Sequence, residues 1–164
     1  MSRTGASRPA FYQYFTDLHD LMETLLHGMR DDILGIAKPW FAGEGNPVLL
    51  LQESLSGLVR VCYKRGPILR AVADAAASDE RLEQAWTTFL KDFDDVVAER
   101  IEQQQAAGLI VPFPARPVAV ALNRLDASML IEQFGRRPRG NPDLVREALT
   151  RIWISTLYGL QVMP

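Results

Sequence analysis

The chain has 164 residues, of which 48% are hydrophobic, and a formal net charge of -2 at pH 7. This length and composition allow one substantial apolar core, while the charge excludes a bulk electrostatic attraction to nucleic acid, so any DNA affinity must come from a local patch. One cysteine excludes an internal disulfide, and no apolar run approaches the length of a membrane span, so we expect a cytoplasmic protein.

The first segment, residues 1–15, is locally basic, because it contains Arg3 and Arg8 and no acid. Ser7 is a suitable N-cap, since its hydroxyl can accept a hydrogen bond from a backbone N–H of the first helical turn. Pro9 fits that turn because its missing N–H has no intrahelical partner there. The sequence therefore predicts a short helix that begins at Ser7.

The side chains of this short helix divide into two faces. Phe11 and Phe15 lie four residues apart and share one face, while Tyr12, Gln13 and Tyr14 point elsewhere. Hydroxyl and amide groups beside arginine suit phosphate oxygens and base edges. The same pattern also describes an ordinary amphipathic helix with surface tyrosines, so composition leaves both interpretations open.

Apolar residues at three- and four-residue intervals predict amphipathic helices along the rest of the chain. Turns rich in glycine and proline separate them, and the Gly66-Pro67 pair is expected to end one helix. The predicted helices span residues 17–41, 47–64, 67–77, 78–105, 117–134 and 142–160. The predicted fold class is therefore all-α.

Both histidines lie in the first of these helices. His19, Glu23 and His27 follow one another at four-residue steps on one face and could in principle contact a metal. Ligands spread over two turns of a single helix do not converge on one ion, so we predict a solvated face and no bound metal.

Other chemistry-bearing residues favour structural roles. Cys62 lies in an apolar stripe and is predicted to be a buried, inert thiol. The arginines of the loop 135–141 are predicted to be solvated, although they could touch phosphate. The sequence has no glycine-rich phosphate loop, Cys-x-x-Cys pair or nucleophile elbow, so we predict no cofactor and no enzymatic activity.

A pocket can be sought where aromatic and polar residues recur among apolar ones. Trp86, Phe89 and Phe93 follow one helical face, and Asn123 and Asp126 lie on a later helix. A buried amide and carboxylate need partners, so they bond each other and the backbone or await a ligand. Both an aromatic core and a ligand pocket fit this pattern.

Residues 5–15, followed by a capped amphipathic helix, resemble the end of the helix-turn-helix of TetR-family transcriptional regulators. The glycine, the capping serine and the Phe-Tyr-x-x-Phe pattern carry the resemblance. It implies that residues 7–15 are the recognition helix, which enters the major groove of DNA. The DNA-binding candidates are Arg3, Ser7, Arg8, Tyr12, Gln13 and Tyr14.

The resemblance implies two parts, a remnant of the helix-turn-helix at 1–16 and a helical ligand-binding and dimerisation domain at 17–164. Only residues 1–4 precede the glycine turn, where the family places further helices. Either the start of the chain is shortened, or the regulator lacks independent DNA binding. We expect residues 1–15 to be the least ordered or most rearranged part of the structure.

Three further stretches, 86–89, 121–123 and 152–159, resemble a TetR-family repressor with a long apolar tunnel. The ligand-binding candidates are Trp86, Phe89, Phe93, Asn123, Asp126 and Trp153. The final helix is apolar over much of its circumference and needs more than one packing partner, and in the family the last two helices form a homodimer.

The function implied by this resemblance is a ligand-responsive TetR-type regulator whose binding to operator DNA is relieved by a small hydrophobic effector. The alternative is a small-molecule-binding helical dimer that does not bind DNA, because its helix-turn-helix is incomplete.

Overall fold

The computed structural model describes residues 18–159, and this part of the chain contains five α-helices and no strand. The helices are α2 (Leu18–Ala42), α3 (Pro47–Ala76), α4 (Glu80–Ala106), α5 (Ala115–Phe134) and α6 (Pro142–Leu157). The prediction of an all-α fold is confirmed. None of these helices is long and apolar enough to cross a membrane.

Three helices begin at side-chain caps that the sequence makes recognisable. Asn46 accepts hydrogen bonds from the first backbone N–H groups of α3, Asp79 from that of Leu82 in α4, and Asn141 from those of α6. A proline follows both asparagines, at the first helical position, where its missing N–H costs nothing. These caps fix where the loops end and the packed helices start.

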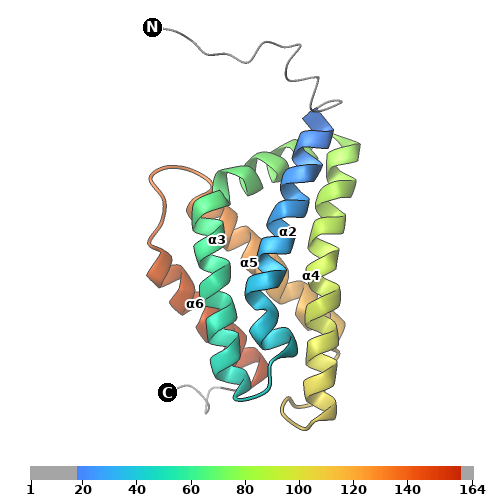
Figure 1. Cartoon of the computed structure of the whole chain (residues 1–164), viewed down its shortest axis with the longest axis vertical. Helices are drawn as coiled ribbons and strands as arrows, with labels where there is room; N and C mark the ends of the chain where they lie inside the picture. Colours follow the sequence, from blue (N-terminus) through green and yellow to red (C-terminus); the bar gives the residue numbers. More distant parts are fainter. Residues whose placement is uncertain (1–17, 160–164) are drawn as a thin grey trace, which may run out of the picture.

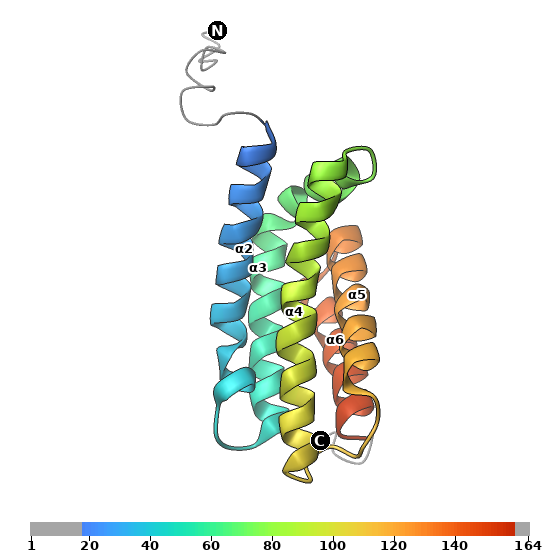
Figure 2. The ribbon, with the colours of Figure 1, turned by 90° about the vertical axis from the view of Figure 1, so that its right-hand side faces the viewer.

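α3 is the central helix of the bundle, because it packs against all four others. Figure 1 shows α2, α3 and α4 running side by side, with α5 and α6 behind them. In Figure 2, α2 lies on one side of α3 and α4, and α5 and α6 lie on the other side.

Buried side chains form two apolar clusters along this bundle. One contains Trp40, Leu55 and Trp153, and the other contains Met29 and Phe134. Half-buried Leu58 packs against both clusters. The cavity described below lies where the two clusters meet.

α3 continues through Pro67, so the prediction that Gly66-Pro67 ends the helix was wrong. A proline inside a helix costs about 3 kcal/mol, through a lost hydrogen bond and a clash with the preceding turn. Beyond it, Leu69 and Val72 are buried at 4% and 1% exposure, and burying such side chains contributes about 1.5–3 kcal/mol each. Burial therefore outweighs the break, and the last turns of α3 bend instead, as Figure 1 shows.

The recognition helix predicted for residues 7–15 lies outside the described residues. The same holds for the DNA-binding candidates Arg3, Ser7, Arg8, Tyr12, Gln13 and Tyr14, and for the expectation that residues 1–15 are poorly ordered. All of these stay predictions.

Candidate functional site

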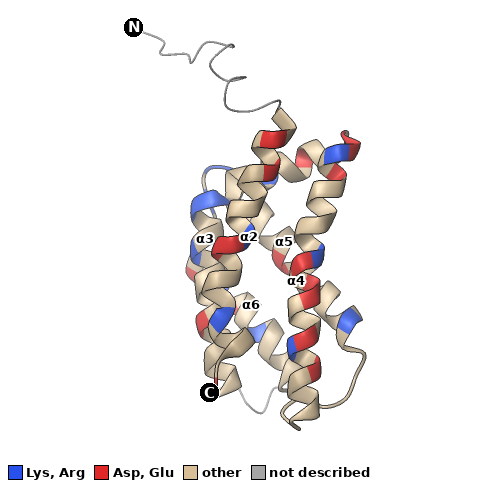
Figure 3. Cartoon of the chain, turned by 45° about the vertical axis from the view of Figure 1, so that its right-hand side comes forward, with Lys and Arg blue, Asp and Glu red and all other residues tan. Residues whose placement is uncertain are grey.

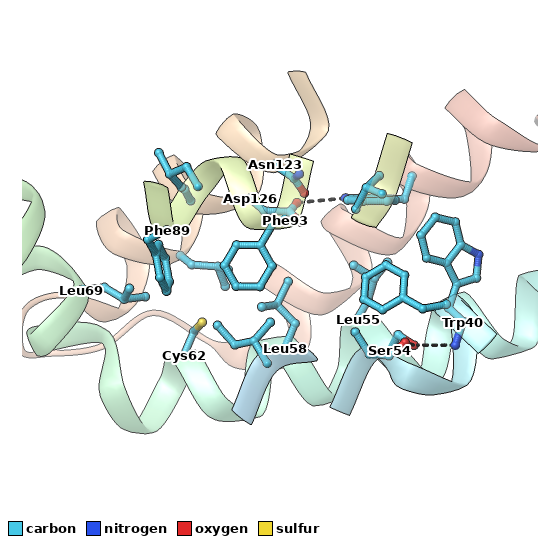
Figure 4. A pocket seen from close by; sticks show the side chains of 18 of the residues that line it. Trp40, Ser54, Leu55, Leu58, Cys62, Leu69, Phe89, Phe93, Asn123 and Asp126 are labelled. Carbon is cyan, nitrogen blue, oxygen red and sulfur yellow. Dashed lines mark hydrogen bonds between the residues drawn. The ribbon is translucent and has the colours of Figure 1, made fainter. Parts of the chain in front are cut away.

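A cavity runs through the centre of the bundle, and all five described helices contribute to its lining. The volume accessible to the centre of a water-sized sphere is about 90 Å³. The total empty volume, which includes the openings of the cavity to solvent, is about 760 Å³. Its lining is mainly aliphatic and aromatic, with few polar side chains, as in most small-molecule sites. Figure 4 shows these side chains pointing toward one another.

One wall of the cavity is aromatic and comes from α4. Trp86 and Phe89 are stacked with their ring centroids 5.4 Å apart, and Phe89 meets Phe93 edge-on at 5.1 Å. The three residues lie at helical spacings of three and four, so they share one face of the helix. The sequence placed these residues on one face, and the structure places that face against the cavity.

The opposite end of the cavity is closed by a second aromatic group. Trp40 meets Trp153 edge-on at 5.9 Å. The indole N–H of Trp40 donates to the Tyr158 hydroxyl over 2.9 Å, and that hydroxyl donates to Gln104 over 2.5 Å. Ser54 accepts from the backbone N–H of Trp40. This end of the cavity is therefore held by hydrogen bonds as well as by packing.

Asp126 is the acid of the cavity. It lies on α5, is 6% exposed, and accepts a hydrogen bond at Oδ1 from the indole N–H of Trp153 over 3.0 Å. Burial raises the pKa of Asp126 to about 7, and the hydrogen bond from Trp153 offsets part of this rise. No other hydrogen bond or ion pair joins Asp126 to the described part of the chain, so Oδ2 is unpartnered there.

The side chain of Asn123 belongs to a polar cluster that contains Asp94 and Arg124 but not Asp126. Its amide donates to Asp94 Oδ1 over 2.9 Å, and Arg124 donates to both oxygens of Asp94 over 3.1 and 2.9 Å. Asn123 and Asp126 do not bond each other. The two polar candidates therefore differ, because Asn123 is already engaged while Asp126 retains a free oxygen.

Cys62 and Ser54 also line the cavity but were not among the site candidates. Burial raises the pKa of the Cys62 thiol to about 12, with a smaller contribution from the charge of Asp126. The thiol is thus buried, as predicted from the apolar stripe of its helix. The apolar stripe predicted that Cys62 is buried, but no local sequence pattern indicates that a buried helix face borders a cavity.

The structure places all six ligand-binding candidates in the lining of this one cavity. They are Trp86, Phe89, Phe93, Asn123, Asp126 and Trp153. Whether they contact an effector stays a prediction.

The histidine face of α2 takes part in contacts between helices. His19 Nε2 lies 2.6 Å from Asp79 Oδ2 at the cap of α4, and Glu23 accepts from Arg81 over 2.9 Å. His27 lines a surface hollow together with Glu23 and Arg81. Within residues 18–159, no three potential metal-ligating side chains come together. The solvated-face prediction was therefore wrong for His19, which bridges two helices.

One arginine of the basic loop 135–141, which precedes α6, is not solvated as predicted. Arg139 lies with its guanidinium carbon 5.1 Å from the centre of the Tyr63 ring. This cation–π contact joins the loop to α3. Arg139, which was predicted to be solvated, thus packs against α3.

The family model of the C-terminal domain of the transcriptional regulator EthR matches residues 51–159, which include all six ligand-binding candidates. The HTH-type transcriptional regulator EthR of Mycolicibacterium smegmatis is 23% identical over 162 residues, covering 94% of this chain and 73% of that protein.

Two solved structures share the fold. A TetR-family transcriptional regulator of Syntrophomonas wolfei superposes with a TM-score of 0.79 at 17% identity, covering 97% of this chain and 82% of that one. A second, from a Rhodococcus species, gives a TM-score of 0.74 at 18% identity, covering 92% and 80%.

Proposed function

Because the chain belongs to the EthR-type branch of the TetR-family transcriptional regulators, we propose that a small, largely apolar effector in the central cavity relieves its binding to operator DNA. The matched relatives are transcriptional regulators and not enzymes. A cytoplasmic location is part of this proposal, since the operator is there. The observation that carries it is the cavity itself, which all five helices share.

α2 is the element through which an effector would act. It follows directly on residues 1–16, which include the DNA-binding candidates, and it contributes Ile33, Ala37 and Trp40 to the cavity lining. A ligand that pushes on these side chains favours a different pose of α2 against α3 and α4. In a dimer, the distance between the two recognition helices then no longer matches the roughly 34–36 Å spacing of successive major grooves. Only a ligand with different affinities for the two poses can do this.

Polar contacts join α2 to α4 at the start of α2 and near its middle. Arg81 donates to Asp20 over 2.6 Å and to Glu23 over 2.9 Å, and Arg30 donates to Asp92 over 3.1 Å. Figure 3 shows acidic positions near the start of α2 and a basic position near the start of α4 at the same end of the bundle. Ion pairs as exposed as these contribute little to stability, because solvent screens them. Such weak contacts suit an element that has two poses.

The proposed partner is a second copy of the chain, bound through α5 and α6. Leu144 on α6 is 63% exposed, and Ala121 and Ser128 are small exposed residues on α5. Small side chains allow two helices to approach closely. A dimer would bring two DNA-binding segments to the two half-sites of one operator.

The test is titration of a panel of apolar compounds into the protein and its complex with DNA from upstream of its coding region. Fluorescence anisotropy reports DNA binding, and the melting temperature reports ligand binding. We expect active compounds to raise the melting temperature and to lower DNA affinity. The variant Ala127→Leu fills the cavity and should lose both responses, whereas Ala71→Leu, on the exposed face of α3, should keep them.

The outcomes separate the two candidate functions. Compounds that bind the wild type and Ala127→Leu equally would place the ligand outside the cavity and contradict the proposal. Compounds that bind in the cavity without any change in DNA affinity would instead favour a ligand-binding dimer that does not act on DNA.

A further inference from the structure

We propose that the cavity selects effectors that carry a protonated amine, with the Asp126 carboxylate accepting the ammonium N–H and the aromatic wall of α4 surrounding the cation. This inference rests on the proposed function and names the chemical class of its effector.

The charge distribution of the lining is the first argument. Asp126 is the one acid among the described residues that line the cavity, and no lysine, arginine or histidine lines it. Oδ1 is occupied by the Trp153 indole, which comes from α6, while Oδ2 has no partner within residues 18–159. A buried carboxylate without a cation is costly, and a pair with additional hydrogen bonds reduces that cost. The missing partner is therefore a cationic donor.

The surroundings of Asp126 offer no competing cation. The Cys62 thiol faces it from α3 and stays neutral, because its pKa is raised to about 12. On α4, Asp94 is an acid and not a cation, and it is already engaged, because Arg124 donates to both of its oxygens and the Asn123 amide donates to Oδ1. The lining residues of α2 are not titratable. The charge of Asp126 is thus open to a ligand.

Aromatic faces provide the second argument. Phe93 lines the same cavity as Asp126, and Phe89 and Trp86 continue the aromatic wall. Aromatic rings attract cations through their quadrupole, and the attraction strengthens when the cation is desolvated. A carboxylate ligand would be repelled by Asp126, and a neutral alcohol would gain a hydrogen bond without the charge attraction. An apolar body with one ammonium group matches both features of the cavity.

Three probes of one shape test the inference, namely phenylbutylamine, phenylbutanol and phenylbutyric acid. Calorimetry at about pH 8 should show the amine binding the wild type about ten- to a hundredfold more tightly than the alcohol, as expected for a charge-assisted hydrogen bond. The acid should bind weakest. Asp126→Asn should remove the preference for the amine, whereas Asp143→Asn, which removes an exposed acid outside the cavity, should keep it.

The pH profile is the second readout. Asp126 has a pKa of about 7, so amine affinity should rise by up to about tenfold per pH unit below that value and level off above it. Alcohol affinity should stay flat over the same range. This readout needs no variant, so it stands even if Asp126→Asn folds poorly.

The results that overturn the inference are distinct from those that overturn the proposed function. Equal affinity of the wild type for amine and alcohol, or an amine preference that survives in Asp126→Asn, would overturn this inference and leave cavity binding intact. If no probe binds and no compound of the larger panel depends on Ala127, both proposals fail.

Discussion

The indole N–H of Trp153 on α6 donates to the carboxylate of Asp126 on α5 over 3.0 Å, and both side chains are buried. The acid thus lies in an apolar cavity with a single neutral hydrogen-bond donor. One neutral donor offsets only part of the cost of burying a charge, which is why the pKa of Asp126 is raised to about 7. This pair gives the cavity both its polarity and its sensitivity to pH.

Asp126 should make the free energy of unfolding fall as pH rises from about 4 to about 7. Its pKa rises from 3.8 in the unfolded chain to about 7 in the folded one, so the folded state binds more protons in that window. The stabilising contribution is complete below the unfolded pKa and lost above the folded pKa. Asp126→Asn should remove it, so that the variant gains up to about 4 kcal/mol relative to the wild type across the window. Urea unfolding at several pH values measures this.

The matched control is Asp143→Asn, because the Asp143 side chain is 75% exposed. A difference between the wild type and Asp126→Asn that does not change with pH would contradict the assignment of a raised pKa.

Trp153→Phe should destabilise the protein by about 1–3 kcal/mol, the cost of leaving a buried acceptor without its donor. The loss should be larger above pH 7, where Asp126 is ionised, than near pH 5. Trp86→Phe is the comparison, since no hydrogen bond of the Trp86 indole is found among residues 18–159. If both variants lose equal stability at both pH values, packing and not the hydrogen bond accounts for the effect.

The helices and the aromatic wall could be predicted from sequence because both depend on local spacing. Trp86, Phe89 and Phe93 share a face by helical periodicity alone, and the Asn46 cap is a local signal as well. The continuation of α3 through Pro67 could not be predicted. It depends on the burial of Leu69 against helices distant in the sequence.

The hydrogen-bond partners of Asn123 and Asp126 likewise could not be predicted from the sequence. Asn123 and Asp126 were recognised as a pair needing partners, but the choice of Asp94 and Trp153 depends on how α4 and α6 pack against α5. His19 shows the same limit, because Asp79 lies 60 positions away in the chain. Periodicity predicts which face is buried, and tertiary packing decides what that face meets.

The Asp94–Arg124 ion pair should respond unequally to removal of its two partners. The Asp94 side chain is 3% exposed and that of Arg124 is 42% exposed. Arg124→Met leaves a buried carboxylate with only Asn123, and should cost about 3–5 kcal/mol. Asp94→Asn frees a guanidinium that can turn to water, and should cost about 1–2 kcal/mol. Thermal and urea unfolding of both variants provide the comparison.

The exposed ion pair between Arg146 and Asp143 on α6 is the control for that comparison of stability losses. Arg146 and Asp143 have side chains that are 48% and 75% exposed, so Arg146→Met should change stability by less than about 1 kcal/mol. Equal losses for Arg124→Met and Asp94→Asn would show that burial of the carboxylate does not decide the cost.

Gly66→Ala should destabilise the protein by about 1–3 kcal/mol, because α3 and α5 touch at this position. An added Cβ would lie 2.4 Å from the backbone oxygen of Phe134, which cannot move without shifting the helix. Gly28→Ala, on an exposed face of α2 with nothing within 4 Å, should instead gain about 0.5–1 kcal/mol. Unfolding curves that show the same sign for both changes would contradict this view of the α3–α5 contact.

Cys62 should react very slowly with a small neutral thiol reagent such as iodoacetamide, because the thiolate is the reactive form. Burial raises the pKa of Cys62 to about 12, against 9.0 for an ordinary thiol, so at neutral pH the thiolate fraction falls by about a thousandfold. Since Cys62 lines the cavity, a bound effector should slow the reaction further, whereas unfolding in guanidinium should restore the ordinary rate. Mass spectrometry of the labelled protein over time measures all three rates. Fast labelling of the native protein, unaffected by a cavity ligand, would show that this thiol is neither buried nor part of the site.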